Sequence, residues 1–271
     1  MTTLEHDDAY FVSPGGSIRA FLKHRVLTLT IDRYAVRNAM DADGWAGLDA
    51  VLGLAESDDD VRCLVLMGAG GTFCSGADMS VPSPGHPLPR IRSIGRVAQR
   101  LFAFPKPVIA RVEGYAIGAG WSLALCCDVV AAAEDAKFSA IFAARGLSLD
   151  FGASWLLPRL AGLQQAKRLA YLADFVTARE AFDLGLVTWV KPADELGDFV
   201  AATASKMAEM PPIALAQTKE LVNGSASWTF AEAVDEEARA QAVNYATEDT
   251  ARAAAAFRDK SKVEYTGRWG M

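Results

Sequence analysis

The pattern of apolar and polar positions predicts strands that alternate with helices over most of the chain. Residues 25–32 alternate leucine and isoleucine with threonine, as a strand with one buried face does, and 18–23 form a second strand beside them. Residues 62–67 are almost continuously apolar, which is typical of a strand covered on both faces. A helix with one apolar stripe is expected after Asp41, ending near Glu56.

The second half of the chain adds short strands and then becomes helical. A strand is expected at 129–133, and a helix begins near Ser154. Threonine–glutamate capping boxes at 177–180 and 229–232 predict two further helix starts. From about residue 196 the chain reads as helices only. We therefore predict an α/β fold with one candidate boundary, which separates residues 1–195 from residues 196–271.

Two glycine-rich segments, 68–79 and 114–120, each follow a buried strand, and the second continues into an apolar helix. Glycine lets a backbone approach its neighbour closely, and unpaired N–H groups at a helix start favour negative charge on a ligand. Two such turns in one sheet predict one binding site built from both. The proline-rich loop 80–90 is expected to be irregular, either as a lid or as a plain surface loop.

Composition narrows the classes of partner. The 271 residues are 51% hydrophobic and carry a net charge of −6 with no sustained basic stretch, which argues against nucleic acid. No apolar run approaches the roughly 20 residues of a membrane helix, and no leader pattern precedes the fold, so a soluble cytoplasmic protein without membrane contact is expected. The four cysteines lack CxxC spacing and are expected to be buried, reduced thiols.

Several kinds of chemistry are excluded by missing residues. Gly120-Trp121-Ser122-Leu123-Ala124 resembles a hydrolase nucleophile elbow, but all three histidines precede Ser122, so the triad order fails. No Gly-Lys-Ser/Thr follows either glycine turn, a full dinucleotide fingerprint is absent, and no cluster has metal-ligand spacing. Backbone donors from two turns remain, and such pairs hold an oxygen that gains negative charge in acyl chemistry, for example in a thioester enolate.

Two motifs carry a family resemblance. Phe73-Cys74-Ser75-Gly76-Ala77-Asp78-Met79 and Gly114-Tyr115-Ala116-Ile117-Gly118-Ala119-Gly120 resemble the oxyanion-hole segments of the crotonase (enoyl-CoA hydratase/isomerase) superfamily. The likeness runs from the strand before Asp32 to the tail at 256–260. It implies a spiral of ββα units in residues 1–195 and a C-terminal helical region that forms trimers, often paired into hexamers. It also implies an acyl-CoA substrate, with coenzyme A as part of that substrate and no separate cofactor.

The resemblance also implies roles for individual residues. The N–H groups of Ala77 and Ala119 would form the oxyanion hole, while Phe257 and Lys260 would approach the coenzyme A of a neighbouring subunit. Asp78 could instead cap a helix after the first turn, and Lys260 could be a solvated tail charge. The other residues expected at the substrate are Arg37, Ala39, Ser75, Asp78, Met79, Gly118, Ser122 and Phe142.

Departures from the family pattern favour one reaction. Family hydratases carry glutamates where this chain has Ser122 and Phe142, and hydration needs those carboxylates to activate water and deliver a proton. Residues 149–160 resemble the segment of family isomerases, including the phenylacetate-pathway type, in which an acid before a glycine moves the proton. Asp150 is therefore predicted to be the base of an enoyl-CoA isomerase; alternatively it caps the following helix.

Three other functions stay open beside the isomerase. The chain could be an enoyl-CoA hydratase, which the residues at 122 and 142 disfavour. It could run another enolate reaction, such as thioester hydrolysis, with Asp150 activating water. It could also bind acyl-CoA without turnover, since a fold alone does not determine a reaction.

Overall fold

The computed structural model describes residues 9–80 and 85–270 and is built around a seven-stranded sheet. Its strands, from one edge to the other, are β1 (Phe11–Val12), β2 (Ile18–Lys23), β3 (Val26–Ile31), β4 (Cys63–Gly68), β5 (Val108–Val112), β7 (Val129–Ala133) and β10 (Trp189–Lys191). β1, β2 and β3 pair antiparallel, whereas every later pairing is parallel. The apolar run of β4 is buried at the centre of this sheet, as its lack of alternation predicts.

A second, three-stranded sheet leaves the main sheet near the glycine turns. It consists of β6 (Tyr115–Ile117), β8 (Lys137–Ser139) and β9 (Val176–Thr177), with β8 in the middle. β6 pairs in parallel with β8, from Tyr115 opposite Lys137 to Ile117 opposite Ser139. The segment expected to be only a turn before a helix therefore contains a short strand, which directs the second glycine turn away from β5.

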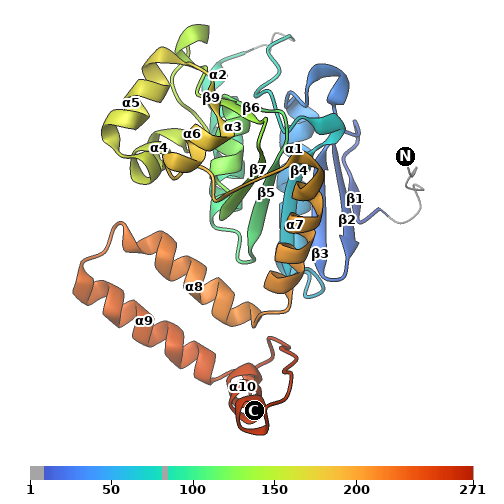
Figure 1. The fold of residues 1–271 in the computed structure, drawn as a ribbon, viewed down its shortest axis with the longest axis vertical. Coiled ribbons are helices and arrows are strands. Elements are labelled where there is room, and N and C mark those ends of the chain that lie inside the picture. Colours follow the sequence, from blue (N-terminus) through green and yellow to red (C-terminus); the bar gives the residue numbers. More distant parts are fainter. Residues whose placement is uncertain (1–8, 81–84, 271) are drawn as a thin grey trace.

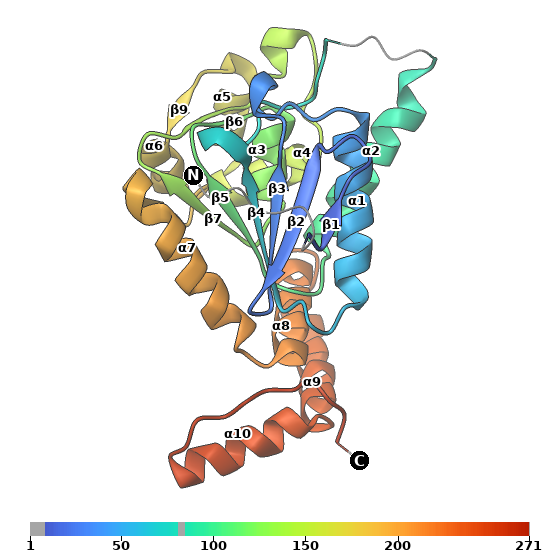
Figure 2. The same ribbon diagram turned by 90° about the vertical axis from the view of Figure 1, so that its right-hand side faces the viewer.

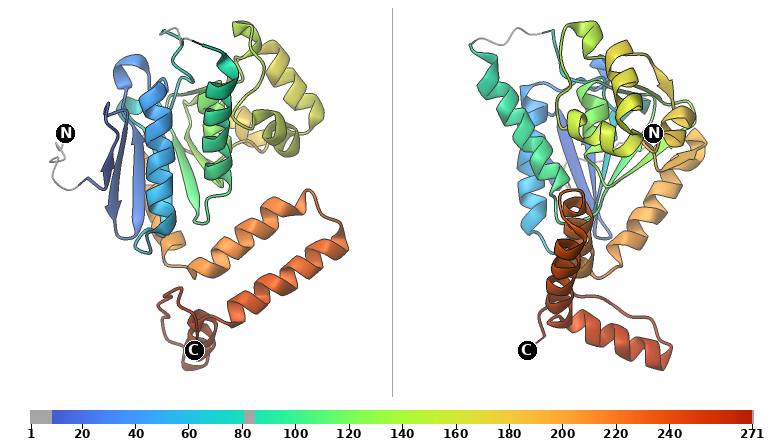
Figure 3. Two further views of the ribbon diagram at one scale, coloured as in Figure 1. Left: turned by 180° about the vertical axis from the view of Figure 1, so that it is seen from behind. Right: turned by 90° about the vertical axis from the view of Figure 1, so that its left-hand side faces the viewer.

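Helices cover both faces of the main sheet. α1 (Ala42–Ser57) contacts β2 and packs beside α2 (Pro87–Phe102), and α7 (Ala193–Ala208) covers the opposite face against β4, β5 and β7 (Figures 1 and 3). The short helices α3 (Ala119–Leu125), α4 (Ala153–Ala161), α5 (Leu163–Leu172) and α6 (Ala178–Asp183) gather around the second sheet. The side chain of Thr177 accepts from Glu180 N at the start of α6, where a helix start is predicted.

Three helices form an arm that projects from this core. They are α8 (Pro212–Ser225), α9 (Phe230–Tyr245) and α10 (Glu248–Asp259), and Figure 2 shows them beyond the end of the sheet. The Lys219 ammonium in α8 lies 2.9 Å from the Asp128 carboxylate, which fixes the arm to the core. The predicted boundary at 195 falls inside α7, which packs on the sheet, so the arm starts after that helix. The division into two domains stays a prediction.

The prediction of an irregular loop over 80–90 is partly wrong. Residues 81–84, with Pro82 and Pro84, lie outside the described part of the chain, but α2 already begins at Pro87 and includes Pro89. Proline is tolerated there because the N–H groups of a first helical turn have no partner in the helix. His86 caps this helix by accepting from Leu88 N at 3.2 Å.

The described residues agree with two further expectations. All four cysteines are buried and free of disulfides, as the lack of CxxC spacing predicts. Within residues 9–80 and 85–270, no helix combines the length and apolar character that a membrane crossing requires.

Candidate active site

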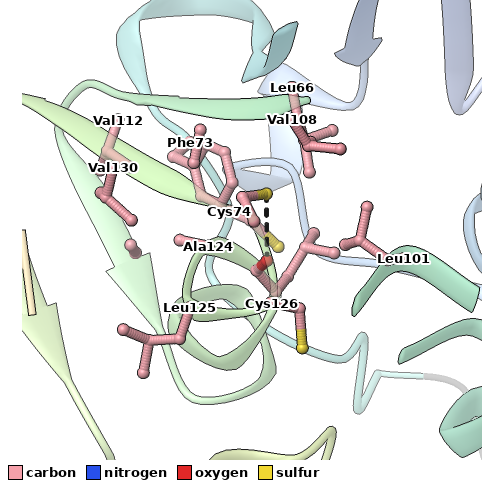
Figure 4. Close-up of a cluster of buried hydrophobic side chains, with 14 of the residues drawn as sticks. Leu66, Phe73, Cys74, Leu101, Val108, Val112, Ala124, Leu125, Cys126 and Val130 are labelled. Atoms are coloured by element: carbon pink, nitrogen blue, oxygen red, sulfur yellow. Dashed lines mark hydrogen bonds between the residues drawn. The ribbon is translucent and has the colours of Figure 1, made fainter. Parts of the chain in front are cut away.

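The two glycine turns lie backbone against backbone. Cys74 N donates to the Tyr115 carbonyl, and Ile117 N donates to the Cys74 carbonyl, both at 2.9 Å. A Cβ added to Gly120 would lie 2.3 Å from that same Cys74 oxygen, so no larger residue fits at this position. Figure 4 shows Phe73 and Cys74 from the first turn in one apolar cluster with Ala124 and Cys126 from the end of α3.

The predicted donor Ala77 has its N–H turned away from its strand partner. Met40 donates to the Gly76 carbonyl at 2.8 Å and accepts from Asp78 N at 2.9 Å. In a parallel bridge of this kind, the residue between the two bonded ones directs its own N–H and carbonyl away from the partner strand. Here that residue is Ala77, between Gly76 and Asp78. Among the hydrogen bonds of the described residues, Ala77 N donates to no protein acceptor.

The second predicted donor lies close to the first. Ala119 is the first residue of α3, so its N–H has no acceptor within the helix, and no other acceptor contacts it in the described chain. A Cβ built on Gly76, the residue before Ala77, would lie 3.6 Å from Ala119 N. The structure thus brings together the two turns that the glycine spacing places at one site.

Asn38 holds the first turn in place, whereas the family resemblance implied only that its loop, 37–39, lines the substrate cleft. Its side chain is fully buried, donates to the carbonyls of Ala69 at 2.8 Å and Thr72 at 2.6 Å, and accepts from Arg33 N at 2.9 Å. Its backbone has φ of 57°, a left-handed conformation that asparagine tolerates better than most residues. That preference, in a polar loop between a strand and a helix, is the signal that would have indicated this role.

The other residues expected near the first turn surround its outer side. Ser75 N donates to the Arg37 carbonyl at 3.0 Å, which joins loop 37–39 to the turn. The Arg37 guanidinium lies 5.9 Å from the centroid of the Tyr115 ring, Ala39 is half-buried, and Met79 is 66% exposed. The structure brings all of these residues to the first turn, where their contact with a substrate stays a prediction.

Asp78 has a local partner and caps no helix. Its carboxylate accepts from Ser80 N at 2.9 Å and from the Arg33 guanidinium at 2.9 Å. Hydrogen bonds from Ser80 and Arg33 lower the pKa of Asp78 to about 2, so it stays ionised. The next helix of the described chain is α2, which begins at Pro87, so the interpretation of Asp78 as a helix cap is wrong.

The surroundings of the second turn contain a hydroxyl and a phenyl ring where hydratases carry glutamates. Ser122 is 2% exposed, and its Oγ donates to the Gly118 carbonyl at 3.2 Å. Phe142 is also buried, and its Cζ would lie 3.9 Å from a Cβ built on Gly118. Neither side chain can exchange a proton with a substrate in the way a carboxylate does.

Asp150 has the electrostatic character of a base and no capping role. Burial raises the pKa of its carboxyl to about 6, and its Oδ1 is buried with no hydrogen-bond partner among the described residues. The residue that caps α4 is Gly152, and no side chain bonds to that helix start. The alternative that Asp150 caps the following helix is therefore wrong.

Phe257 and Lys260 lie on the arm, at the opposite end of the molecule from α3 (Figures 1 and 2). Phe257 is 87% exposed, and Lys260 follows the last turn of α10. Both line a shallow hollow on α10. Within one chain they do not reach the glycine turns, so their predicted contact with coenzyme A would be made in a neighbouring subunit.

Comparison with known proteins identifies the family. A family model described as enoyl-CoA hydratase/isomerase matches residues 22–268. The chain belongs to the enoyl-CoA hydratase/isomerase family. This membership makes it an acyl-CoA-processing enzyme and confirms the crotonase resemblance. In the described residues, no group of three His, Cys, Asp or Glu side chains could hold a metal ion.

Individual members of the enoyl-CoA hydratase/isomerase family differ in the reaction that they are named for. The chain is 34% identical to 1,2-epoxyphenylacetyl-CoA isomerase of Escherichia coli (strain K12), covering 93% of this chain and 98% of that one. It is 33% identical to short-chain-enoyl-CoA hydratase of Clostridium acetobutylicum, covering 89% and 94%. The crystal structure of enoyl-CoA hydratase from Bacillus anthracis matches with a TM-score of 0.89 at 28% identity, covering 93% and 100%, which confirms the predicted fold class.

Proposed function

We propose that this chain is an enoyl-CoA isomerase that shifts a carbon–carbon double bond with Asp150 as the base. The observation that carries the proposal is the half-buried carboxyl of Asp150, whose Oδ1 is buried without a hydrogen-bond partner among the described residues and whose pKa is raised to about 6. Perturbed titratable groups of this kind favour a role in proton transfer. The substrate is an acyl-CoA thioester, and coenzyme A takes part only as a portion of it.

The reaction needs one base and one oxyanion site. The Asp150 carboxylate removes a proton from Cα of a 3-enoyl-CoA, and the electron pair moves onto the thioester oxygen to give a dienolate. The N–H groups of Ala77 and Ala119 donate to that oxygen, and each such donor contributes a few kcal/mol in acyl chemistry. The protonated Asp150 then returns the proton to Cγ, which leaves a 2-enoyl-CoA with no water consumed.

The raised pKa of Asp150 suits both halves of this transfer. A carboxyl with a pKa of about 6 is mostly ionised at pH 7, and it is a stronger base than an exposed aspartate. Once protonated, it is still acidic enough to give the proton back within the same site. An ordinary exposed aspartate would be the weaker base in the first step.

The second turn supports isomerisation over hydration. Ser122 Oγ already donates to the Gly118 carbonyl, and the Phe142 ring is apolar, so neither offers a carboxylate to hold and activate water. The substrate's coenzyme A would meet Phe257 and Lys260 of a neighbouring subunit in a homotrimer or hexamer. Loss of coenzyme A affinity in Lys260→Ala would support that arrangement over a solvated tail charge.

The decisive experiment is Asp150→Asn assayed on a 3-enoyl-CoA. The amide keeps the shape of the side chain but cannot take the proton, so kcat should fall by roughly 10³. Asp135→Asn, an exposed aspartate in the turn between β7 and β8, is the matched control and should keep full activity. Unchanged turnover in a folded Asp150→Asn protein would contradict the proposal.

The same assays distinguish the alternative functions. Faster addition of water to a 2-enoyl-CoA than isomerisation of a 3-enoyl-CoA would identify a hydratase, and release of free coenzyme A would identify a thioesterase. Binding of acyl-CoA without turnover or deuterium exchange at Cα would identify a non-catalytic binder. An epoxyphenylacetyl-CoA belongs in the same panel, because the Escherichia coli relative is named for that substrate.

A further inference from the structure

The residues that follow Asp150 form a tight turn in which a phenylalanine, Phe151, has a left-handed backbone conformation. Ala153 N donates to the Asp150 carbonyl at 3.0 Å, and the two residues between them, Phe151 and Gly152, have φ of 49° and 82°. Two consecutive left-handed residues closed by this hydrogen bond describe a type I′ turn, whose first central position favours asparagine, aspartate or glycine. Phenylalanine at that position is strained, so contacts outside the turn must hold it.

Two such contacts are present on Phe151. Its side chain is 4% exposed, and its ring centroid lies 5.1 Å from that of Trp45 in α1. Its carbonyl accepts from the Cys126 thiol at 3.4 Å. Burial raises the pKa of Cys126 to about 12, so the thiol keeps the proton that it donates.

Cys126 connects this turn to the donor half of the site through one short helix. Ala119 is the first residue of α3, and Cys126 directly follows its last residue. Seven steps along an α-helix span about 10 Å. A rigid element of that length therefore carries the predicted oxyanion donor at one end and bonds the turn of the predicted base at the other.

We infer that Phe151 and Cys126 are positioning residues, which hold the Asp150 turn at a fixed distance from the Ala119 N–H. The inference rests on the proposed role of Asp150 as the base. Without these contacts from Trp45 and Cys126 to Phe151, the strained turn can relax, and the neighbouring Asp150 carboxylate can lose its burial. Misplacement of a catalytic group by about 1 Å can cost as much as 10²-fold in rate.

The test compares two adjacent cysteines in the full chain. Cys126→Ala removes the donor to the Phe151 carbonyl. Cys127→Ala removes a second buried thiol, which donates to the Leu123 carbonyl of α3 at 3.5 Å and makes no hydrogen bond to the turn among the described residues. We expect Cys126→Ala to lower kcat about ten-fold at unchanged KM, Cys126→Ser to recover most of the loss, and Cys127→Ala to match the wild type.

A second measurement does not depend on turnover. Burial is the sole cause of the raised pKa of Asp150, with no charged neighbour contributing among the described residues, so a loosened turn should lower that pKa toward its usual 3.8. Titration of ¹³C-labelled aspartate by NMR, with the Asp150 signal identified by its absence in Asp150→Asn, measures the shift. Cys126→Ala should lower the midpoint, and Cys127→Ala should leave it near 6.

Each outcome supports or overturns the inference. An unchanged kcat and an unchanged Asp150 midpoint in Cys126→Ala would overturn it, and so would an equal loss in Cys127→Ala, which would indicate general weakening of the helix end. If Cys126→Ala does not fold, Phe151→Leu takes its place, because it keeps an apolar residue but loses the Trp45 ring contact. If Asp150→Asn retains isomerisation, the proposed function fails; if only Asp150→Asn is impaired, the positioning role alone fails.

Discussion

The proposed donor half and the proposed base half of the candidate site are built from different parts of the residues, main chain in one and a side chain in the other. The donor half is main chain, with Gly76 and Gly120 letting two backbone segments touch. The base half is one side chain, Asp150, on a strained turn in which Phe151 packs against Trp45 and accepts from the Cys126 thiol. Changing the side chain of a donor residue leaves its N–H in place, whereas changing residue 150 removes the base. The first half therefore depends on backbone packing, and the second depends on side-chain identity and burial.

The largest effect is expected from Gly120→Ala, which tests whether the donor half depends on backbone packing. The new Cβ would lie 2.3 Å from the Cys74 carbonyl oxygen, so one of the two turns must move. We expect the free energy of unfolding to fall by about 3 kcal/mol and isomerase activity to be lost. Gly95→Ala in α2 is the control, because its Cβ would meet nothing within 4 Å, and it should stabilise the helix by about 0.5 kcal/mol. Equal denaturation midpoints for the two variants would contradict the packing argument.

A smaller loss is expected from Asn38→Ala, which leaves the donors themselves intact. The substitution leaves Arg33 N and the carbonyls of Ala69 and Thr72 without their partner. Urea denaturation should show a loss of about 2 kcal/mol, because buried polar groups left unpaired are costly. Ser75→Ala removes only an exposed bond to the Val36 carbonyl at 3.4 Å and should change stability little. A stable Asn38→Ala protein would show that the first turn holds its shape without this side chain.

The last effect has the opposite sign and distinguishes the proposed base from the proposed donors. The folded pKa of Asp150 is about 6, above the ordinary 3.8 expected in the unfolded chain, so ionisation above pH 6 costs folding free energy that is absent below pH 4. Asp150→Asn should therefore raise the free energy of unfolding by about 2 kcal/mol at pH 8, after allowance for partial solvation, and by almost nothing at pH 3.5.

Unfolding curves of both proteins at the two pH values check this sign. A variant less stable than the wild type at pH 8 would mean that the Asp150 carboxylate makes favourable contacts when ionised. In the wild type, kcat/KM should rise with pH and reach half of its maximum near 6, because kcat/KM reports the free enzyme and only the ionised carboxylate accepts the proton.

Periodicity predicted the main sheet well, because β3 and β4 have clear one-faced and two-faced apolar patterns. It did not predict β6, which has three residues and takes its direction from pairing with β8 rather than from its own sequence. The start of α2 at Pro87 was also missed, because prolines were treated as breakers although a first helical turn accepts them.

The candidate site also has features that the sequence predicted and features that it did not. Glycine spacing was enough to predict that 68–79 and 114–120 meet, since close backbone approach is encoded locally. The residue type of Asn38 indicates a left-handed loop position, but its bonding partners and the burial of Asp150 were not predictable, because both depend on how the chain folds in three dimensions. Desolvation of a carboxyl depends on the residues that surround it, and these come together only in the folded protein.

The main-chain donors of the two glycine turns also bear on how such an enzyme can diverge. An oxyanion site made of backbone N–H groups keeps its donors when neighbouring side chains change, provided that the two turns keep their packing. Substitutions at 122, 142 or 150 can then change the group that transfers the proton without removing the proposed oxyanion donors. Such independence is consistent with the similar identities of this chain to a relative named as a hydratase, 33%, and to one named as an isomerase, 34%.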